Sequence, residues 1–274
     1  MQSNLIRLQV FLSRNGVCSR RKAFDLVRAK RVSVNGQQVA EPSTPVDPRK
    51  DNICVDDKVV TAKAYTYILF NKPQGCVTTR EDRFAEKTVF DLLPAEFRHL
   101  VPVGRLDKDT EGLLLLTNDG DLTYKLTHPR FDIDKMYRVK MTGTLEPKDR
   151  QALERGIVIE GRRSAPARIQ DARRAGNDTE FTITIHEGRK RQIRLMVAHI
   201  GQKVTFLQRI AQGPLRLGDL KVGRWRELTD KEIQSLQKIV SPAKRALRQA
   251  QDPSRRSPER SRGNTFHEIR TTNL

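Results

Sequence analysis

The stretch GRLDKDTEGLLLLTNDGD, residues 104–121, decides how the rest of the chain is arranged. It places five carboxylates around four consecutive leucines, although the whole chain has a formal net charge of +19. Four leucines bounded by turn residues are typical of a buried strand. A carboxylate beside such a strand is costly unless a cation or a hydrogen-bond donor meets it. The stretch therefore indicates a metal loop, a solvated turn, or one catalytic carboxylate in a basic cleft.

The three interpretations make different demands on the residues. The pattern D-x-D-x-E-G from Asp107 matches positions 1, 3, 5 and 6 of a calcium loop, but position 12 is Asn118 and leucines fill the stretch that should carry ligands 7 and 9. A solvated turn suits Asp119 and Asp121, which flank Gly120. It does not suit Asp107, which precedes a segment that must be buried. We therefore expect no metal site and favour a catalytic role for Asp107.

The positive charge is clustered rather than spread. The chain has 52 Lys and Arg against 33 Asp and Glu. Residues 1–64 hold 12 basic and 6 acidic side chains, and residues 241–274 hold 8 and 3, so these ends carry +6 and +5. Such an excess points to a polyanion, with nucleic acid as the default partner, whereas a basic surface kept for solubility is the alternative.

Cysteine usage and hydropathy bear on the compartment. Cys18, Cys54 and Cys76 are odd in number, and no two have metal-ligand spacing, which fits a reducing cytosol. No window approaches 18 apolar residues, and no signal peptide is recognisable. We expect a cytoplasmic protein that does not span a membrane, with a monomer as the default state.

The N-terminal 64 residues predict a compact module. Residues 6–13 suit a short helix, and Ser19 can cap a second one that turns Ala23, Phe24 and Val27 inward. Asn35-Gly36 between two half-strands is a strong hairpin signal. Residues 14–31 hold seven basic side chains and one acidic one, which predicts a cationic helix face.

The remaining chain alternates strand and helix patterns and predicts an α+β fold with a mixed, mainly antiparallel sheet and flanking helices. A strand that ends in a Lys-Pro-x-Gly turn is expected over 65–78. Further strands are expected over 112–118, 135–143, 158–174, 179–188 and 204–215, and helices over 121–128, 146–156, 189–201 and 229–240. A short helix and loop are expected over 83–100. We expect domains at 4–64 and 65–240, followed by a basic, disordered tail at 241–274.

Two resemblances sharpen this reading. The stretch RLQVFLSRNGVCSRRKAFDLVRAKRVSVNGQQV resembles the S4 (α-L-like) RNA-binding domain over about residues 4–64. The motifs YILFNKPQGCVTT, HLVPVGRLDKDTEGLLLLTNDGD, DKMYRV and EGRKRQIRLM, in this order, resemble the RsuA/RluB/RluE/RluF family of ribosomal RNA pseudouridine synthases. Residues 116–129 and 213–233 are closest to the RluB-like branch, which acts on 23S rRNA. Leu195 departs from that pattern, because an arginine more often precedes the methionine.

The family resemblance implies roles for three residues. Asp107 is expected to be the catalytic aspartate, Tyr137 to stack on the target base, and Arg194 to pair with the aspartate. No cofactor or metal is expected, because the reaction breaks the uridine N1–C1′ bond and rejoins C1′ to C5. The carboxylate either attacks C1′ or removes the C2′ proton, and the residues leave both routes open.

The partner implied is ribosomal RNA, 23S rRNA first, or a pre-ribosomal particle. The basic residues expected to contact it are Arg20, Arg21, Lys22, Arg28, Arg31, Lys72, Arg105, Arg189, Lys190 and Arg191. Two alternatives stay open: a synthase of the RsuA type acting on 16S rRNA, and a non-catalytic S4-type RNA-binding or ribosome-assembly factor. An RNA-cleaving hydrolase has no paired histidines or metal-ligand set near Asp107 to support it.

Overall fold

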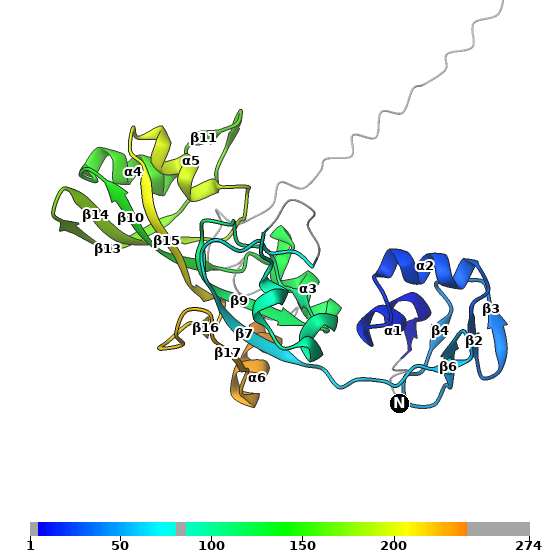
Figure 1. Ribbon diagram of the computed structural model, residues 1–274. Helices are drawn as coiled ribbons and strands as arrows, with labels where there is room; N and C mark the ends of the chain where they lie inside the picture. Colours follow the sequence, from blue (N-terminus) through cyan, green and yellow to red (C-terminus); the bar gives the residue numbers. More distant parts are fainter. Residues whose placement is uncertain (1–4, 81–85, 240–274) are drawn as a thin grey trace, which may run out of the picture.

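The computed structural model describes residues 5–80 and 86–239, which form two units joined by an extended segment (Figure 1). The predicted tail at 241–274, and residues 83–85 of the helix and loop predicted over 83–100, lie outside the described ranges. Residues 60–66, between the units, have no regular secondary structure. We keep the boundary between residues 64 and 65 as a proposal.

The N-terminal unit packs two helices against short antiparallel strands. The helices are α1 (Leu8–Arg14) and α2 (Arg20–Arg28). The strands are β1 (Ile6–Arg7), β2 (Val32–Val34), β3 (Gln37–Val39), β4 (Pro45–Val46), β5 (Ile53–Val55) and β6 (Lys58–Val59), in the orders β1-β4 and β3-β2-β5-β6. As predicted, Ser19 caps α2 by accepting from the Lys22 backbone N–H at 3.3 Å. Asn35 and Gly36 have φ of +53° and +81°, as a tight hairpin requires.

One residue of α2 faces the opposite way from the prediction. Ala23 and Val27 are buried, but Phe24 is 43% exposed, so its predicted inward position is wrong. Positions i and i+4 share a helix face, whereas the next residue is turned by about 100°. Phe24 therefore lies outside, beside the Arg28 guanidinium, which sits 5.6 Å from its ring centroid.

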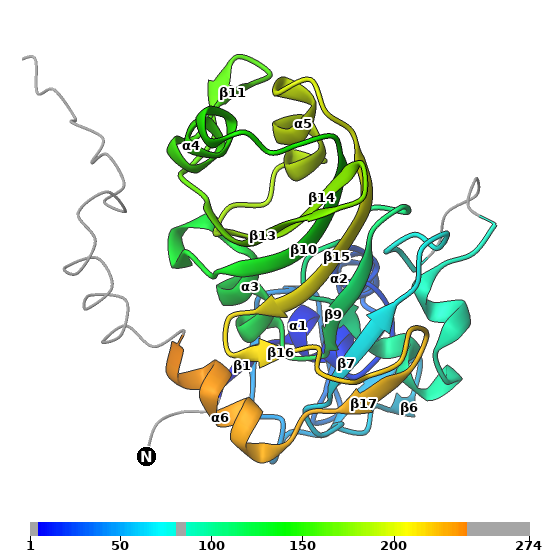
Figure 2. The same cartoon turned by 90° about the vertical axis from the view of Figure 1, so that its left-hand side faces the viewer.

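The C-terminal unit is built on one nine-stranded sheet, in the order β13-β14-β10-β15-β9-β7-β17, with β16 beside β15 and β8 beside β9 (Figure 2). Its strands are β7 (Tyr67–Lys72), β8 (Val101–Pro102), β9 (Glu111–Thr117), β10 (Lys135–Thr142), β13 (Arg168–Ala175), β14 (Asp178–Ile185), β15 (Val204–Gln212), β16 (Leu215–Arg216) and β17 (Trp225–Glu227). A separate hairpin pairs β11 (Val158–Ile159) with β12 (Arg162–Arg163). The predicted α+β class and mainly antiparallel sheet are confirmed.

Helices cover both faces of this sheet. They are α3 (Gly120–Thr127), α4 (Pro147–Arg155), α5 (Gln192–His199) and α6 (Asp230–Ile239), with the 3-10 turns η1 (Val89–Leu92), η2 (Ala95–His99) and η3 (Pro129–Phe131). The four leucines of β9 alternate between two cores: Leu113 and Leu115 pack with α3 and α6, and Leu114 and Leu116 with η1, η2, α4 and α5. A strand that is buried on both faces has apolar residues at every position rather than at alternate ones. This explains why β9 contains four consecutive leucines.

Asp119, which was predicted to lie in a solvated turn, makes defined hydrogen bonds in the structure. Its carboxylate caps α3 by accepting from the Leu122 backbone N–H at 3.0 Å, and it also accepts from the Tyr67 hydroxyl at 3.0 Å. None of the helices in residues 5–80 and 86–239 has the length and apolar character needed to cross a membrane.

The sheet is joined at its middle by a very close approach of two backbones. β9 and β15 run parallel and pair only at Glu111–Gln208 and Gly112–Arg209. A Cβ on Gly112 would lie 2.3 Å from the Arg209 carbonyl oxygen and 2.7 Å from its nitrogen, and Gly112 has φ of +106°. Only glycine suits both the conformation and the contact.

We therefore expect Gly112→Ala to lower the free energy of unfolding by about 3 kcal/mol or more, because the clash is with backbone. Thermal or denaturant unfolding measures this. Gly120→Ala is the matched control, since Gly120 has open space at the Cβ position and begins α3. Equal midpoints for the two variants would contradict the role given to Gly112.

Candidate active site

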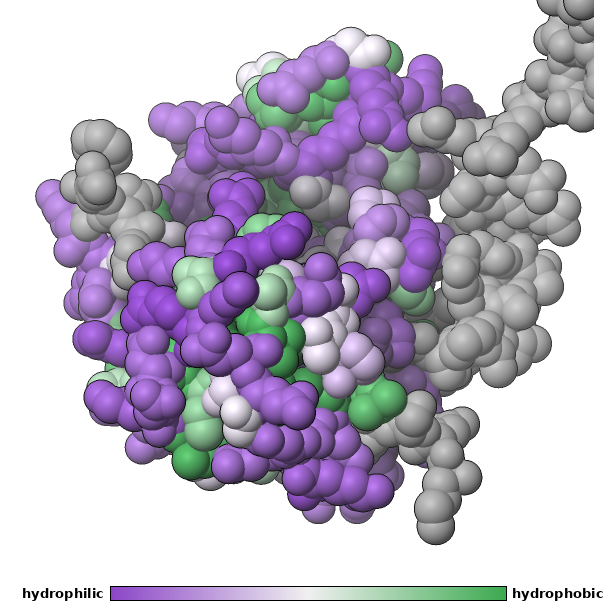
Figure 3. All heavy atoms as spheres, turned by 90° about the vertical axis from the view of Figure 1, so that its right-hand side faces the viewer, coloured by the Kyte–Doolittle hydropathy of each residue, from purple (hydrophilic) through white to green (hydrophobic). Residues whose placement is uncertain are grey.

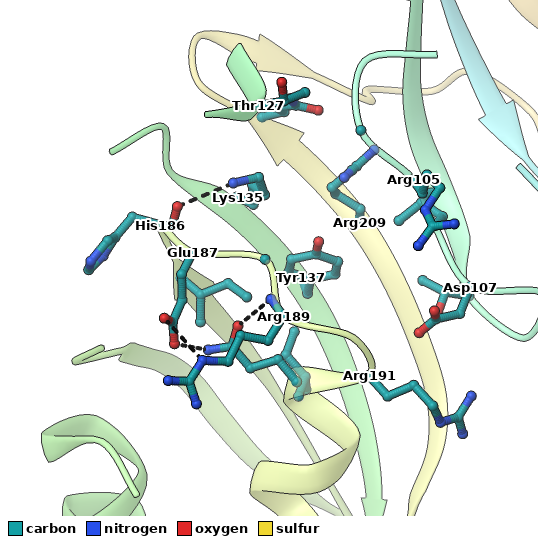
Figure 4. A pocket seen from close by; sticks show the side chains of 18 of the residues that line it. Arg105, Asp107, Thr127, Lys135, Tyr137, His186, Glu187, Arg189, Arg191 and Arg209 are labelled. Carbon is teal, nitrogen blue, oxygen red and sulfur yellow. Dashed lines mark hydrogen bonds and ion pairs between the residues drawn. The ribbon is translucent and has the colours of Figure 1, made fainter. Parts of the chain in front are cut away.

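A cavity of about 200 Å³ opens where the 103–107 loop, the start of β10, the β14–α5 loop and β15 meet. Asp107 enters from one side, Tyr137 stands on β10, and the cations Lys135, Arg191 and Arg209 line the wall (Figure 4). These side chains come from segments far apart in the sequence. The cavity therefore combines the carboxylates of Asp107 and Glu187, the ring of Tyr137 and several positive charges.

Hydrogen bonds from a buried ammonium group fix the backbone of the loop that carries Asp107. Lys72, at the end of β7, is fully buried, and its Nζ donates to the carbonyl oxygens of Pro73 (3.0 Å), Asp107 (3.1 Å) and Thr110 (2.8 Å). A turn bond from the Thr110 N–H to the Asp107 carbonyl closes the loop at 3.1 Å. The Asp107 backbone is thus fixed, while its side chain is left free to face the cavity.

The prediction that Lys72 contacts RNA is therefore wrong. All three of its donors are used inside the protein, and none of its surface is accessible. Burial lowers the pKa of the ammonium, which carbonyl oxygens rather than a carboxylate surround. A lysine in an Asn-Lys-Pro turn is usually a surface residue, so the sequence predicts an exposed charge. The structure shows that the surrounding segments bury it.

Arg194 does not pair with Asp107 as predicted. Its Nε lies 3.2 Å from Asp109 Oδ2, and its Nη2 donates to the Asp109 carbonyl at 2.8 Å. Arg191 meets the same carboxylate at 3.3 Å. Asp109, and more weakly Asp107, favour the charged form of Arg194, while burial lowers its pKa overall. The partner changes because Asp109 is the carboxylate that the turn directs toward the start of α5.

Tyr137 lines the same cavity as Asp107. It is 8% exposed, on the face of β10 turned toward the cavity, and its ring stands across from the Asp107 carboxylate (Figure 4). Its neighbours across the sheet are Ile183 on β14 and Arg209 on β15. A flat ring beside a carboxylate can hold a planar base next to its sugar. The roles of Asp107, Tyr137 and Arg194 in the reaction remain proposals.

The predicted RNA-binding residues fall into two groups. Exposed on or beside α2 are Arg20, Arg21, Lys22, Arg28 and Arg31, the last paired with Asp56 at 2.8 Å. Near the cavity are Arg105, Lys190 and Arg191, all exposed, and Arg189. The Arg189 guanidinium donates to the carbonyls of Arg162 (2.8 Å) and Arg163 (2.9 Å), so it holds the β11–β12 hairpin. Seen from the side of the N-terminal unit, the surface is mostly hydrophilic (Figure 3).

The carboxylates of the calcium-like pattern separate in space. Asp109 meets the two arginines, while Glu111 accepts from Gln208 Nε2 at 3.0 Å. Within the described ranges, no group of three or more His, Cys, Asp and Glu side chains is arranged to hold a metal ion.

Sequence reasoning missed two cations of the cavity, Lys135 and Arg209. Lys135 stands two residues before Tyr137, so strand periodicity places both on one face, and this signal could have found it. Arg209 lies in the apolar strand VTFLQRIAQ and is 2% exposed. Burial lowers the pKa of Lys135 to about 8, and the nearby Arg209 charge adds to the effect.

We expect Lys72→Met to lower the free energy of unfolding by about 3 kcal/mol, because three carbonyls lose the hydrogen bond that the ammonium group donates to them, and the buried Thr110 carbonyl is one of them. The salt dependence of RNA binding should stay the same, since Lys72 reaches no phosphate. Thermal unfolding and filter binding measure the two quantities. Lys108→Met, on the exposed part of the same loop, is the control. A smaller salt dependence with unchanged stability would restore the phosphate contact.

Several known proteins are similar to this chain in sequence or in structure. Residues 66–199 match the family model described as RNA pseudouridylate synthase, and residues 6–53 match that of the S4 domain. An RNA pseudouridine synthase of Aquifex aeolicus is 40% identical over 237 residues, which cover 86% of this chain and 95% of the relative.

Two further similarities cover nearly the same length. Ribosomal large subunit pseudouridine synthase B of Bacillus subtilis is 39% identical over 244 residues, which cover 88% of this chain and 99% of the relative. A pseudouridylate synthase crystal structure matches with a TM-score of 0.60 and 32% identity, over 84% of this chain and 99% of that one. With its S4 domain, these relatives and a pocket that sets Asp107 beside Tyr137, the chain belongs to the family of RNA pseudouridine synthases.

Proposed function

We propose that this enzyme converts a specific uridine of ribosomal RNA into pseudouridine, with Asp107 as the catalytic carboxylate. The observation that carries the proposal is the position of Asp107 across from Tyr137 in a pocket walled by cations. The similarity to the Bacillus subtilis large-subunit enzyme favours 23S rRNA as the substrate. A monomer acting in the cytoplasm is part of the same proposal.

The main requirement of the reaction is a carboxylate positioned beside the ribose. Breaking the N1–C1′ bond and joining C1′ to C5 is an isomerisation, with no net redox change and no group donor. An ionised Asp107 either attacks C1′ or removes the C2′ proton, and both roles need the carboxylate close to the ribose. Tyr137 provides the flat surface that keeps the detached uracil beside the sugar while it turns.

The substrate uridine must leave its stack to enter this pocket. Extruding a base costs a few kcal/mol, and less from a loop or bulge than from a helix. Contacts between cations and phosphates offset this cost. The exposed basic residues of α2, together with Arg105, Lys190 and Arg191 near the cavity, are in position to make such contacts.

The experiment that tests the function maps pseudouridines in rRNA from a strain that lacks this protein, using carbodiimide-dependent reverse-transcription stops. We expect one 23S rRNA stop to disappear and to return with the wild-type gene. Asp107→Asn should not restore it, because the amide cannot supply the negative charge, although the variant should bind RNA normally. An unchanged pattern would refute the rRNA assignment, and a stop lost in 16S rRNA would move the target to the small subunit.

We also expect the double variant Arg20→Gln/Arg21→Gln to weaken RNA binding. The slope of log K against log salt concentration should become shallower by about 1 to 2, as expected for two lost phosphate contacts. Arg49→Gln/Lys50→Gln is the matched control, because it removes the same charge from an exposed turn that is not part of α2. If both double variants shifted the slope equally, α2 would have no particular role.

A further inference from the structure

A register shift in the sheet brings two cations together next to Tyr137. The pairing of β10 with β15 shifts register at two places, and at the one beside the cavity Met136 faces Ala211 whereas Tyr137 faces Arg209, which leaves Ile210 as an extra residue on β15. Such a bulge changes the direction in which the following side chains point. Arg209 therefore lies directly beside Tyr137, and Lys135, two residues earlier on β10, shares the same face of the sheet.

Neither of these two cations forms an ion pair within residues 5–80 and 86–239, although Asp132, Asp134 and Glu187 lie near enough to Lys135 to favour its charged form. In these ranges Lys135 Nζ donates to the carbonyls of Ile133 and His186, each at 3.3 Å. Arg209 Nε donates to the Leu113 carbonyl at 2.7 Å, but its buried Nη2 has no hydrogen-bond partner. An unpartnered guanidinium nitrogen at this depth is costly, so a ligand that satisfies it gains affinity or rate.

We propose that Lys135 and Arg209 bind the carbonyl oxygens of the target uracil and stabilise the negative charge that the base takes on when its N1–C1′ bond breaks. This inference rests on the function proposed above. The two side chains line the same cavity as Asp107 and Tyr137, with Arg209 immediately beside the tyrosine that would hold the base (Figure 4).

The electron count shows why a cation is needed there. When the N1–C1′ bond breaks, its electron pair stays on the base, and the charge spreads over N1, O2 and O4. The electron-poor sugar carbon is either captured by an Asp107 oxygen or relieved by loss of the C2′ proton. C5 of the turned uracil then bonds to C1′, as the bond from Asp107 to C1′ breaks in the first route or as Asp107 returns the proton to C2′ in the second. C5 finally loses its proton and N1 takes one up. The base is thus an anion only between two neutral states.

This transient charge predicts an effect on rate rather than on affinity. A neutral uracil gains little from two cations, whereas its anion gains much, and only interactions that strengthen in the transition state accelerate the reaction. Contacts to a backbone phosphate would behave in the opposite way, because the phosphate is charged before and after reaction. RNA affinity and turnover therefore distinguish the two ligands.

The experiment compares three variants of the full chain on rRNA that is labelled with [5-³H]uridine and isolated from the deletion strain. Tritium release under single-turnover conditions gives the rate, and filter binding gives Kd. We expect Lys135→Met to lower the rate about 100-fold, the scale of losing one charge-stabilising donor, with little change in Kd. Lys135→Arg should keep most of the rate. Lys140→Met is the control, on the opposite face of β10, where Lys140 pairs with Asp178.

The pH profile gives a second readout that a structural role would not change. Arg209, Asp132, Asp134 and Glu187 face Lys135 from the surrounding elements, and the pKa of Lys135 is lowered to about 8. The charge is present below this pH and lost above it, so kcat/KM should fall as the pH rises through about 8. Lys135→Arg should abolish this fall, because arginine stays protonated throughout.

The possible failures can be told apart. An unchanged rate in Lys135→Met would overturn the inference, and so would a weaker Kd with an unchanged rate, which would assign Lys135 to a phosphate. Persistence of the fall near pH 8 in Lys135→Arg would count against it as well. If the wild-type protein itself released no tritium, the proposed function would fail instead. Lys135 is chosen as the test site because Arg209 is buried deeply enough for its loss to affect folding.

Discussion

The ammonium group of Lys72 holds the loop of Asp107 in a fixed shape, and the site depends on that shape. Its three donors satisfy carbonyl oxygens on two segments that are 35 residues or more apart, which ties the end of β7 to the loop before β9. Burying a lysine without a carboxylate partner costs desolvation free energy. The hydrogen bonds to the Asp107 and Thr110 carbonyls offset part of this cost and fix the loop. Within residues 5–80 and 86–239, the arginines beside this loop form their ion pairs with Asp109 rather than with Asp107.

The local patterns of the sequence predicted most of the architecture, because they act over a few residues. The leucine run of β9, the Ser19 cap and the Asn35-Gly36 hairpin each depend on neighbours in the chain. Phe24 was misplaced because one apolar residue beside two others does not reveal on which side of the helix the core lies.

The arrangement of the site was harder to predict, because its contacts join distant segments. The resemblance identified Asp107, Tyr137 and Arg194, and all three lie in or beside the cavity. It did not reveal that Arg194 meets Asp109, because a turn of two residues decides which carboxylate faces α5. Arg209 was not predicted as a site residue, because the residues around it in the strand do not indicate the bulge that places it beside Tyr137.

The parallel pairing of β9 with β15 affects the order in which the protein folds during its synthesis. Glu111 and Gln208, which meet there, are 97 residues apart, whereas the N-terminal unit is held by contacts within about 50 residues. Long-range pairing is slow to form, and chains are made from the N-terminus at about 5–20 residues per second. During synthesis, the S4 domain can therefore fold, and hold RNA, before the strand that completes the catalytic pocket has left the ribosome.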